Sequence, residues 1–257
     1  MIRIQGRAVV YGEVWFDEPP PQPPLDVDVL VYRYHPRPLA NSRATELHSL
    51  RTDLAAAPAI IMGAFDETCR RHIRRAERQD GLRHEIFDAG ALDEFVAFYD
   101  VFALQKGLWL ADRHWLGRAA AARQLALTCV SQDGERLVWH AHLRAGHTAQ
   151  LAHSASLYRS LSPERRSLVG RANRWLHWRD MLDFKAAGAC CYDWGGMFED
   201  ESTPERAGIN HFKRTFGGTP VLAYECTVPV TLRGRVWLRL REVLRRGPRQ
   251  RPAAQAA

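Results

Sequence analysis

Apolar residues recur along the chain with two different spacings, and their order predicts a mixed α/β protein. Residues 7–17 and 26–34 are rich in valine and aromatic side chains or alternate apolar with polar positions, as half-buried strands do. In residues 64–79 and 92–104 the apolar side chains recur every three or four positions, which is the spacing of one helix face. Both kinds of element therefore share one chain, and no internal repeat divides it.

The remaining segments continue this alternation. Turns at Gln132-Asp133-Gly134 and Ala145-Gly146-His147 predict three consecutive strands between residues 125 and 158. The other expected elements are strands at 47–54, 82–88, 189–194 and 221–230, and helices at 114–124, at about 167–187 and around Lys213.

The predicted domain organisation has three parts. Residues 1–45 form an N-terminal strand extension, interrupted at 19–24 by PPPQPP, which cannot sit in a sheet and predicts a stiff connector. Residues 46–230 form the main domain. Residues 231–257 form a basic amphipathic helix followed by a disordered tail.

Composition indicates a soluble globular protein. Of the 257 residues, 46% are apolar and 25% charged, and no apolar run reaches the length of about 18 residues that crosses a bilayer. The charged N-terminus is unlike a signal peptide, and five cysteines without a CxxC pair favour reduced thiols. We therefore expect a cytoplasmic location.

The positive charge is confined to the C-terminus. Residues 233–257 contain eight arginines and one acid, so this segment carries the whole net charge of +7. The rest of the chain is electrically balanced, which is atypical of a nucleic-acid-binding domain.

Four motifs resemble those of a known family. They are Arg70-Arg71-x-Ile73-Arg74-Arg75-Ala76, Ala152–Ser156, Tyr192-Asp193-Trp194-Gly195-Gly196 and Phe212-Lys213-x-x-Phe216-Gly217-Gly218. Together with the order of elements, they resemble the FemAB-like branch of the GNAT acyltransferases over roughly residues 47–228. The resemblance implies a mixed, mostly antiparallel sheet flanked by helices. It also implies an enzyme in which an amine attacks an acyl group directly, on a cell-envelope sugar or precursor.

The resemblance also implies a co-substrate rather than a permanent cofactor. Acyl-CoA, most simply acetyl-CoA, would place its pyrophosphate at a helix N-terminus lined by Arg166, Gly170, Arg171 and Ala172, where backbone N–H groups attract phosphate. The arginine lies one residue farther upstream than in the family pattern. Aminoacyl-tRNA is the alternative donor. The family's peptidoglycan-bridge aminoacyltransferases carry two GNAT-like repeats, whereas this chain has room for one, and residues 1–232 lack the positive surface that tRNA needs.

The same motifs supply the candidate site residues. Catalytic roles are expected for Asp193 at a strand end, for Lys213 near the acyl donor and for His153 as a proton acceptor, with a backbone N–H of strand 148–157 polarising the carbonyl. Substrate contacts are expected from Arg70, Arg74, Tyr192, Gly195 and Gly196. Each has a structural alternative: Arg70 and Arg74 can lie on a solvated helix face, Tyr192 can be a core residue, and Gly195 and Gly196 can form a simple turn.

No metal site is expected. His140 and His142 share one strand face, with His147 after them, but no carboxylate or further histidine has a diagnostic spacing and HExxH is absent. His177, followed by Asp180 and Asp183, misses the HxxxxD spacing of glycerolipid acyltransferases by one residue and is expected on a packed helix face.

The C-terminal helix leaves three interpretations open. Residues 234–246 place Val236, Trp237, Leu240, Val243 and Leu244 on one face with arginines elsewhere. Such a helix can lie on an anionic inner-membrane surface, contact tRNA, or pack on the domain. A membrane-surface binding protein without catalytic activity is accordingly the rival to the enzyme.

Overall fold

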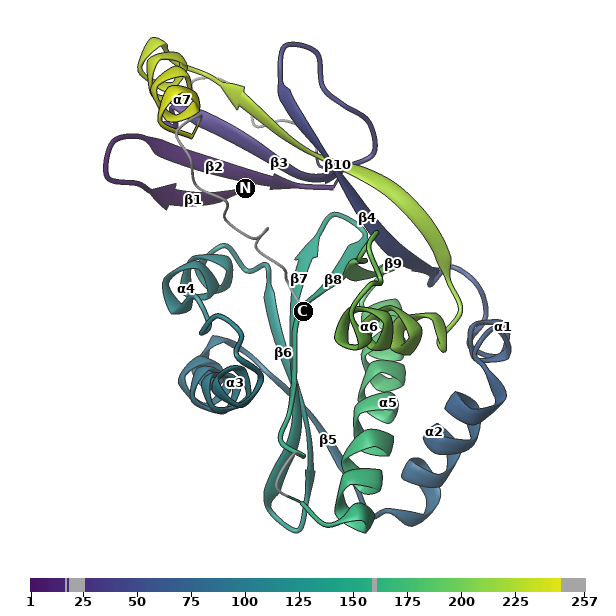
Figure 1. Ribbon diagram of the computed structural model, residues 1–257. Helices are drawn as coiled ribbons and strands as arrows, with labels where there is room; N and C mark the ends of the chain where they lie inside the picture. The colour runs from purple at the N-terminus through teal and green to yellow at the C-terminus, as the bar shows by residue number, and fades with distance from the viewer. Residues whose placement is uncertain (17, 19–25, 159–160, 246–257) are drawn as a thin grey trace. The chain divides into compact units, whose positions relative to one another are not determined.

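The computed structural model describes residues 1–16, 18, 26–158 and 161–245 (Figure 1). It contains two compact units, of which unit 1 combines Met1–Ser49 with the chain from Val221, and unit 2 is Leu50–Pro220. The last strand and helix thus belong with the N-terminal strands, whereas the sequence analysis divides the chain consecutively. The predicted proline-rich connector and disordered tail lie outside the described residues.

Unit 1 is built on strands from both ends of the chain. Its elements are β1 (Ile2–Gln5), β2 (Val10–Trp15), β3 (Val29–His35), the outer parts of β4 (Arg43–Asp53) and β10 (Thr219–Pro229), and helix α7 (Leu232–Arg245). Strand β2 pairs with β1 antiparallel and with β3 in parallel, and β3 pairs antiparallel with β10. Val14, Leu30 and Cys226 are buried in a shared apolar cluster.

Unit 2 contains a mixed sheet whose strand order is β4-β9-β8-β7-β6-β5. Its further strands are β5 (Arg83–Phe87), β6 (Leu125–Gln132), β7 (Glu135–Ala145), β8 (Thr148–Ser156) and β9 (Cys191–Gly196). Strands β5 to β8 pair antiparallel and β8 pairs in parallel with β9, which confirms a mixed, mostly antiparallel sheet.

Helices cover both faces of this sheet. They are α1 (Pro58–Gly63), α2 (Glu67–Gln79), the 3-10 turn η1 (Ala89–Ala91), α3 (Leu92–Lys106), α4 (Arg113–Ala121), α5 (Pro163–Ala186) and α6 (Pro204–Arg214). Helix α5, with α2 beside it, packs on one face around Leu176 and Trp194, and α3 packs on the other around Phe95 and Trp139. Burial of two apolar layers is the main stabilising contribution.

Two helix boundaries differ from the sequence prediction because capping residues set them. The predicted helix 64–79 begins only at Glu67, since the Asp66 carboxylate accepts a hydrogen bond from the Cys69 N–H. Helix α5 begins at Pro163 rather than near residue 167, because the Ser162 hydroxyl accepts from the Arg165 N–H. Proline in the first helical turn loses no hydrogen bond.

We predict that Gly217→Ala destabilises unit 2 more than Gly81→Ala. Both glycines have positive φ, +68° and +61°, but an added Cβ at 217 would lie 2.7 Å from the Ala64 carbonyl oxygen, whereas at 81 it meets nothing within 4 Å. We expect losses of unfolding free energy of about 3 and about 1 kcal/mol, measured by urea denaturation. Equal losses would show that the close approach to Ala64 is unimportant.

Candidate active site

The candidate site lies where two parallel strands separate. Strands β8 and β9 pair only at Thr148–Cys191, Ala149–Tyr192 and Gln150–Asp193, although both continue further. In β8 the register against β7 shifts opposite Ala141 and His142, which leaves Ala152 as a bulge residue. Beyond Gln150, this edge of β8 is therefore free of ladder pairing with β9.

Asp193 stabilises the point of separation. Its carboxylate is fully buried, and it accepts hydrogen bonds from Arg51 Nε at 2.8 Å and from Gln150 Nε2 at 3.3 Å. It also accepts from the Gly195 N–H at 2.9 Å. The carboxylate thus satisfies a backbone donor of β9 just beyond the last pair with β8.

Lys213 binds the backbone of Gly196, the last residue of β9. It lies near the end of α6, and its Nζ donates a hydrogen bond to the Gly196 carbonyl oxygen at 2.7 Å. Burial lowers the pKa of the Lys213 ammonium to about 8, and the nearby Asp193 carboxylate opposes this shift. The structure therefore brings Asp193, Lys213, Gly195 and Gly196 together.

Glycine is required at the centre of this arrangement. Gly195 has φ of +70°, and a Cβ there would lie 2.8 Å from the Leu151 carbonyl oxygen of β8. Asp193 and Lys213 are 0% and 6% exposed, whereas Gly196 and the β8 residues 151–154 are partly exposed. The two charged side chains are therefore buried, and they bind the backbone of Gly195 and Gly196 from inside the protein. A cavity of about 580 Å³ lies elsewhere, within unit 1.

The segment between β9 and α6 is fixed by a residue that the sequence analysis did not identify. Asn210 is fully buried on α6, accepts a hydrogen bond from the Phe198 N–H and donates one to the Phe198 carbonyl oxygen. It thereby fixes the chain between Gly196 and Lys213. A lone asparagine on a short helix gives no sequence signal for this role.

The predicted substrate residue Tyr192 lies on the opposite face of β9 from Asp193. It is fully buried, and its hydroxyl is 3.0 Å from His142 Nε2 and 3.1 Å from His177 Nδ1. Trp194 lies on the same face, as strand alternation requires, and donates from Nε1 to Thr52 Oγ1. This placement favours the core alternative for Tyr192.

His153 packs against α3, on the side of the sheet away from α5. Its ring contacts Tyr99 and Phe95, with centroid separations of 4.7 and 6.1 Å. Burial lowers its pKa to about 4, so the imidazole is neutral at pH 7. Its Nδ1 is buried without a hydrogen-bond partner among the described residues.

The predicted phosphate loop is wrong in one respect: Arg166–Ala172 lies inside α5 and not before it. Because the helix begins at Pro163, most backbone N–H groups of this segment are used by the helix. Arg171 forms a two-point ion pair with Asp80, and Ala172 is in the core. Gly170 lies in the third helical turn, and Arg166 Nε donates to the Leu161 carbonyl oxygen.

The predicted arginine contacts on α2 have different surroundings. Arg70 donates from Nη1 to the carbonyl oxygens of Gly63 and Phe65, so it closes the junction between α1 and α2. Arg74 is exposed. The hydrogen bonds of Arg70 go to backbone at this junction and not to Asp193 or Lys213, and the solvated-face alternative fits Arg74.

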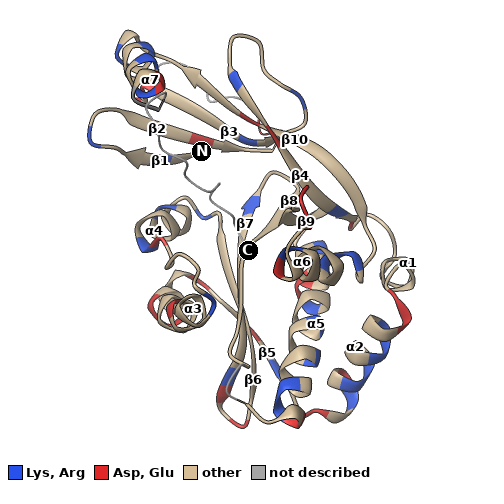
Figure 2. Ribbon diagram, in the orientation of Figure 1, with Lys and Arg blue, Asp and Glu red and all other residues tan. Residues whose placement is uncertain are grey.

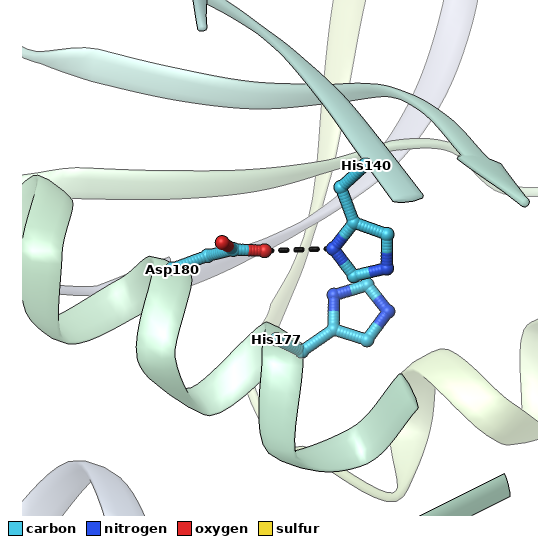
Figure 3. Close-up of side chains that lie close together, drawn as sticks. All are labelled: His140, His177 and Asp180. Atoms are coloured by element: carbon cyan, nitrogen blue, oxygen red, sulfur yellow. Dashed lines mark hydrogen bonds and ion pairs between the residues drawn. The ribbon is translucent and has the colours of Figure 1, made fainter. Parts of the chain in front are cut away.

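A second polar cluster lies on the α5 face of the sheet (Figure 3). His140 and His142 of β7 meet His177 and Asp180 of α5, and all four side chains are fully buried. The sequence contained both halves of this cluster, but only the packing of α5 on β7 brings them together.

Comparison with known proteins places the fold. No protein-family model and no curated protein matches the chain. A crystal structure of FemX is similar over 75% of this chain, with a TM-score of 0.59 and 15% identity. The C-terminal domain of a putative lysylphosphatidylglycerol synthetase from Agrobacterium fabrum is similar over 84% of this chain and 72% of its own length, with a TM-score of 0.50 and 14% identity.

A conserved protein of unknown function from Bacteroides thetaiotaomicron VPI-5482 is also similar, with a TM-score of 0.51, 9% identity and coverage of 74% of this chain and 63% of its own. These likenesses confirm the FemAB-like, GNAT-type fold that the motifs indicated. The chain spans 63% of the FemX structure.

We predict that Lys213 makes the stability of unit 2 depend on alkaline pH. Its pKa is about 8 in the folded protein against an ordinary 10.5, so between these values the unfolded chain binds more protons and stability rises with pH. The unfolding free energy of wild type minus that of Lys213→Met should increase by about 2 kcal/mol between pH 8 and 10 in urea titrations. A constant difference would contradict the burial of the ammonium.

Proposed function

We propose that this chain is an acyltransferase that transfers an acyl group, most simply acetyl from acetyl-CoA, to an amine. The observation that supports it best is the separation of β8 from β9 after Gln150 and Asp193. In the GNAT-type fold this separation is where a thioester carbonyl can meet a free strand edge. An acceptor on a cell-envelope sugar or precursor extends the same resemblance.

The chemistry requires positioning more than a nucleophilic side chain. A backbone N–H on the free edge of β8, near the Ala152 bulge, would donate to the thioester carbonyl and stabilise the oxyanion. The amine nitrogen forms a bond to the carbonyl carbon, the carbon–sulfur bond breaks, and the amine proton ends on the CoA thiol. Gly195 and Gly196 allow backbone to approach the reacting atoms closely.

Asp193 and Lys213 are positioning residues in this proposal. Both are buried, and both bind the Gly195–Gly196 backbone directly. His153 is the weaker candidate for a base, because a pKa of about 4 suits proton removal from an amine poorly near neutral pH.

Aminoacyl-tRNA is the alternative donor. Fold likeness to FemX is compatible with it, but the surface of a tRNA-binding protein needs a broad excess of positive charge, and residues 1–232 have none. Acyl-CoA, a small co-substrate, does not need that surface. We therefore favour the CoA thioester.

We predict that acetyl-CoA raises the melting temperature of the protein, whereas aminoacyl-tRNA does not. Ligands that bind only the folded state stabilise it in proportion to the logarithm of their concentration, so a shift of several degrees is expected at about 100 times Kd. Differential scanning fluorimetry measures it.

The site assignment is tested with Asp193→Ala, which should lose most of the acetyl-CoA shift because the Gly195 N–H loses its acceptor. Asp53→Ala is the matched control, since Asp53 lies at the end of the neighbouring strand β4 and its carboxylate accepts a hydrogen bond from the Ala55 N–H rather than from the β9 backbone. A shift retained in Asp193→Ala would refute the site, and a shift with tRNA alone would refute the donor.

We also propose that α7 contacts an anionic membrane surface through part of the predicted face, without Trp237. Trp237 does not point outward, because its Nε1 donates to the Tyr11 hydroxyl at 2.6 Å. Gly234 packs against the Asp28 carbonyl oxygen so closely that no side chain would fit. The helix is therefore fixed on the unit 1 strands by this side.

The opposite side of α7 presents an apolar stripe. Leu232, Val236, Leu240 and Val243 are 50–76% exposed and recur at positions i, i+4, i+8 and i+11. At 100° per residue this stripe is narrow, with Arg233 beside one edge and Arg239 beside the other. Figure 2 shows the basic residues along α7. A stripe of this kind flanked by arginines matches lipid tails below anionic headgroups. No helix in the described ranges is long and apolar enough to cross the bilayer.

We predict that the protein sediments with phosphatidylglycerol-containing vesicles and less with pure phosphatidylcholine. Val236→Gln combined with Leu240→Gln should lower binding about tenfold or more, because two apolar side chains no longer enter the lipid. Both positions are exposed, so folding is preserved.

The control is Val101→Gln combined with Leu104→Gln, a pair of exposed apolar residues on α3. It should bind like wild type, and added salt should weaken binding. If the α7 variant sediments as well as wild type, the stripe does not contact lipid.

A further inference from the structure

The buried polar cluster between β7 and α5 contains an arrangement that hydrogen bonds alone do not explain. His140 and His142 come from β7, and His177 and Asp180 lie one turn apart on α5 (Figure 3). All four side chains have zero exposure. Burying a carboxylate among imidazoles costs free energy unless each polar atom is paired.

The ring of His140 faces oxygen atoms on both sides. Its Nδ1 is 2.7 Å from Asp180 Oδ2, and its Nε2 is 2.9 Å from Asn173 Oδ1. A carboxylate and an amide oxygen are both acceptors, but a neutral imidazole has only one N–H to donate. With the Asn173 amide in this orientation a neutral ring cannot satisfy both oxygens, so the ring carries a second proton, the amide turns to present its N–H, or a metal ion binds Nδ1.

Further donor atoms converge on the same point. His140, His177 and Asp180 each offer a ligand atom, and these atoms all lie within 4.8 Å of one another. His142 Nε2 is 3.5 Å from Asp180 Oδ2. Asp180 Oδ1 has no hydrogen-bond partner among the described residues, although His84 Nε2 lies 3.9 Å from it. His177 Nε2 is also buried without a partner there, whereas its Nδ1 lies 3.1 Å from the Tyr192 hydroxyl.

We propose that His140, His177 and Asp180 bind one divalent transition-metal ion, by ligand type Zn²⁺. The His142 side chain, whose Nε2 now contacts the Tyr192 hydroxyl and lies 3.5 Å from Asp180 Oδ2, turns to complete the four ligands. Zinc prefers four nitrogen or oxygen donors at about 2.0–2.1 Å, which separates the donors by about 3.3 Å. The separations of 2.7 and 3.5 Å around Asp180 Oδ2 bracket this value. This proposal does not depend on the acyl-transfer function.

The surrounding contacts fit a metal site. With Nδ1 bound to the ion, the Nε2–H of His140 donates to Asn173 Oδ1, which is the outer hydrogen bond that orients a metal-bound histidine. Three imidazoles and one carboxylate close the coordination, and the complete burial leaves no place for a substrate. The site is therefore structural, and it ties β7 to α5.

The experiment measures the metal content of the intact protein. Protein purified without chelators, incubated with an equal amount of Zn²⁺ and desalted should contain about one zinc per chain by plasma mass spectrometry. Substitution with Co²⁺ should give the visible absorption of tetrahedral cobalt. Dipicolinate should lower the melting temperature, and Zn²⁺ should restore it.

Asp180→Asn and His177→Gln should each retain less than about a tenth of the wild-type zinc. The matched control is His153→Gln, which removes a half-buried histidine that packs against α3 on the opposite face of the sheet and should keep full occupancy. Circular dichroism identifies variants that do not fold, and the wild-type measurements stand without them.

Wild-type protein with less than about a tenth of a zinc per chain, and no cobalt spectrum, would show that a second proton or a turned Asn173 amide satisfies the His140 ring and would overturn the proposal. Zinc retained in Asp180→Asn and His177→Gln alike would place the metal elsewhere and overturn it too. Neither result bears on the acetyl-CoA shift, so the two proposals fail separately.

Discussion

The separation of β8 from β9 is the constraint on which the rest of unit 2 depends. Parallel strands that part inside a protein leave backbone donors and acceptors without ladder partners, and such groups are costly to bury. Here two side chains supply the hydrogen-bond partners: Asp193 accepts from the Gly195 N–H, and Lys213 donates to the Gly196 carbonyl oxygen. The opening is thus stable without a ligand, which is what a preorganised site requires.

Strand β9 is held on both faces. Asp193 binds Arg51 of the neighbouring strand on one side, while Tyr192 meets two histidines and Trp194 meets Thr52 on the other. On one face the buried Asp193 carboxylate is paired with Arg51, and on the other the buried Asp180 carboxylate lies among imidazoles. Alternate residues of one short strand therefore serve two separate groups, Tyr192 the histidine cluster and Asp193 the strand opening.

Much of this architecture could be predicted from the sequence, because it depends on local periodicity. The three central strands, the flanking helices and the opposite orientation of Asp193 and Tyr192 follow from spacing alone. Predicted helix starts differ from the structure where a capping residue such as Ser162 begins the helix ahead of its apolar spacing. For this reason the predicted phosphate loop lies inside α5. Partners distant in sequence, such as Arg51 for Asp193 or Asp180 for His140, leave no local pattern, so only tertiary packing reveals them.

The distribution of charge would separate the two proposed tasks, membrane contact and acyl transfer, between the units. All of the excess positive charge lies in residues 233–257, so attraction to an anionic surface resides in the segment that begins with α7. Unit 2 contains the strand opening, and its buried charges are paired internally and little screened by salt. Ionic strength should therefore govern where the protein binds and leave the geometry of the Gly195–Gly196 backbone unaffected. Strands β4 and β10 run through both units, so the two tasks share a backbone while relying on different forces.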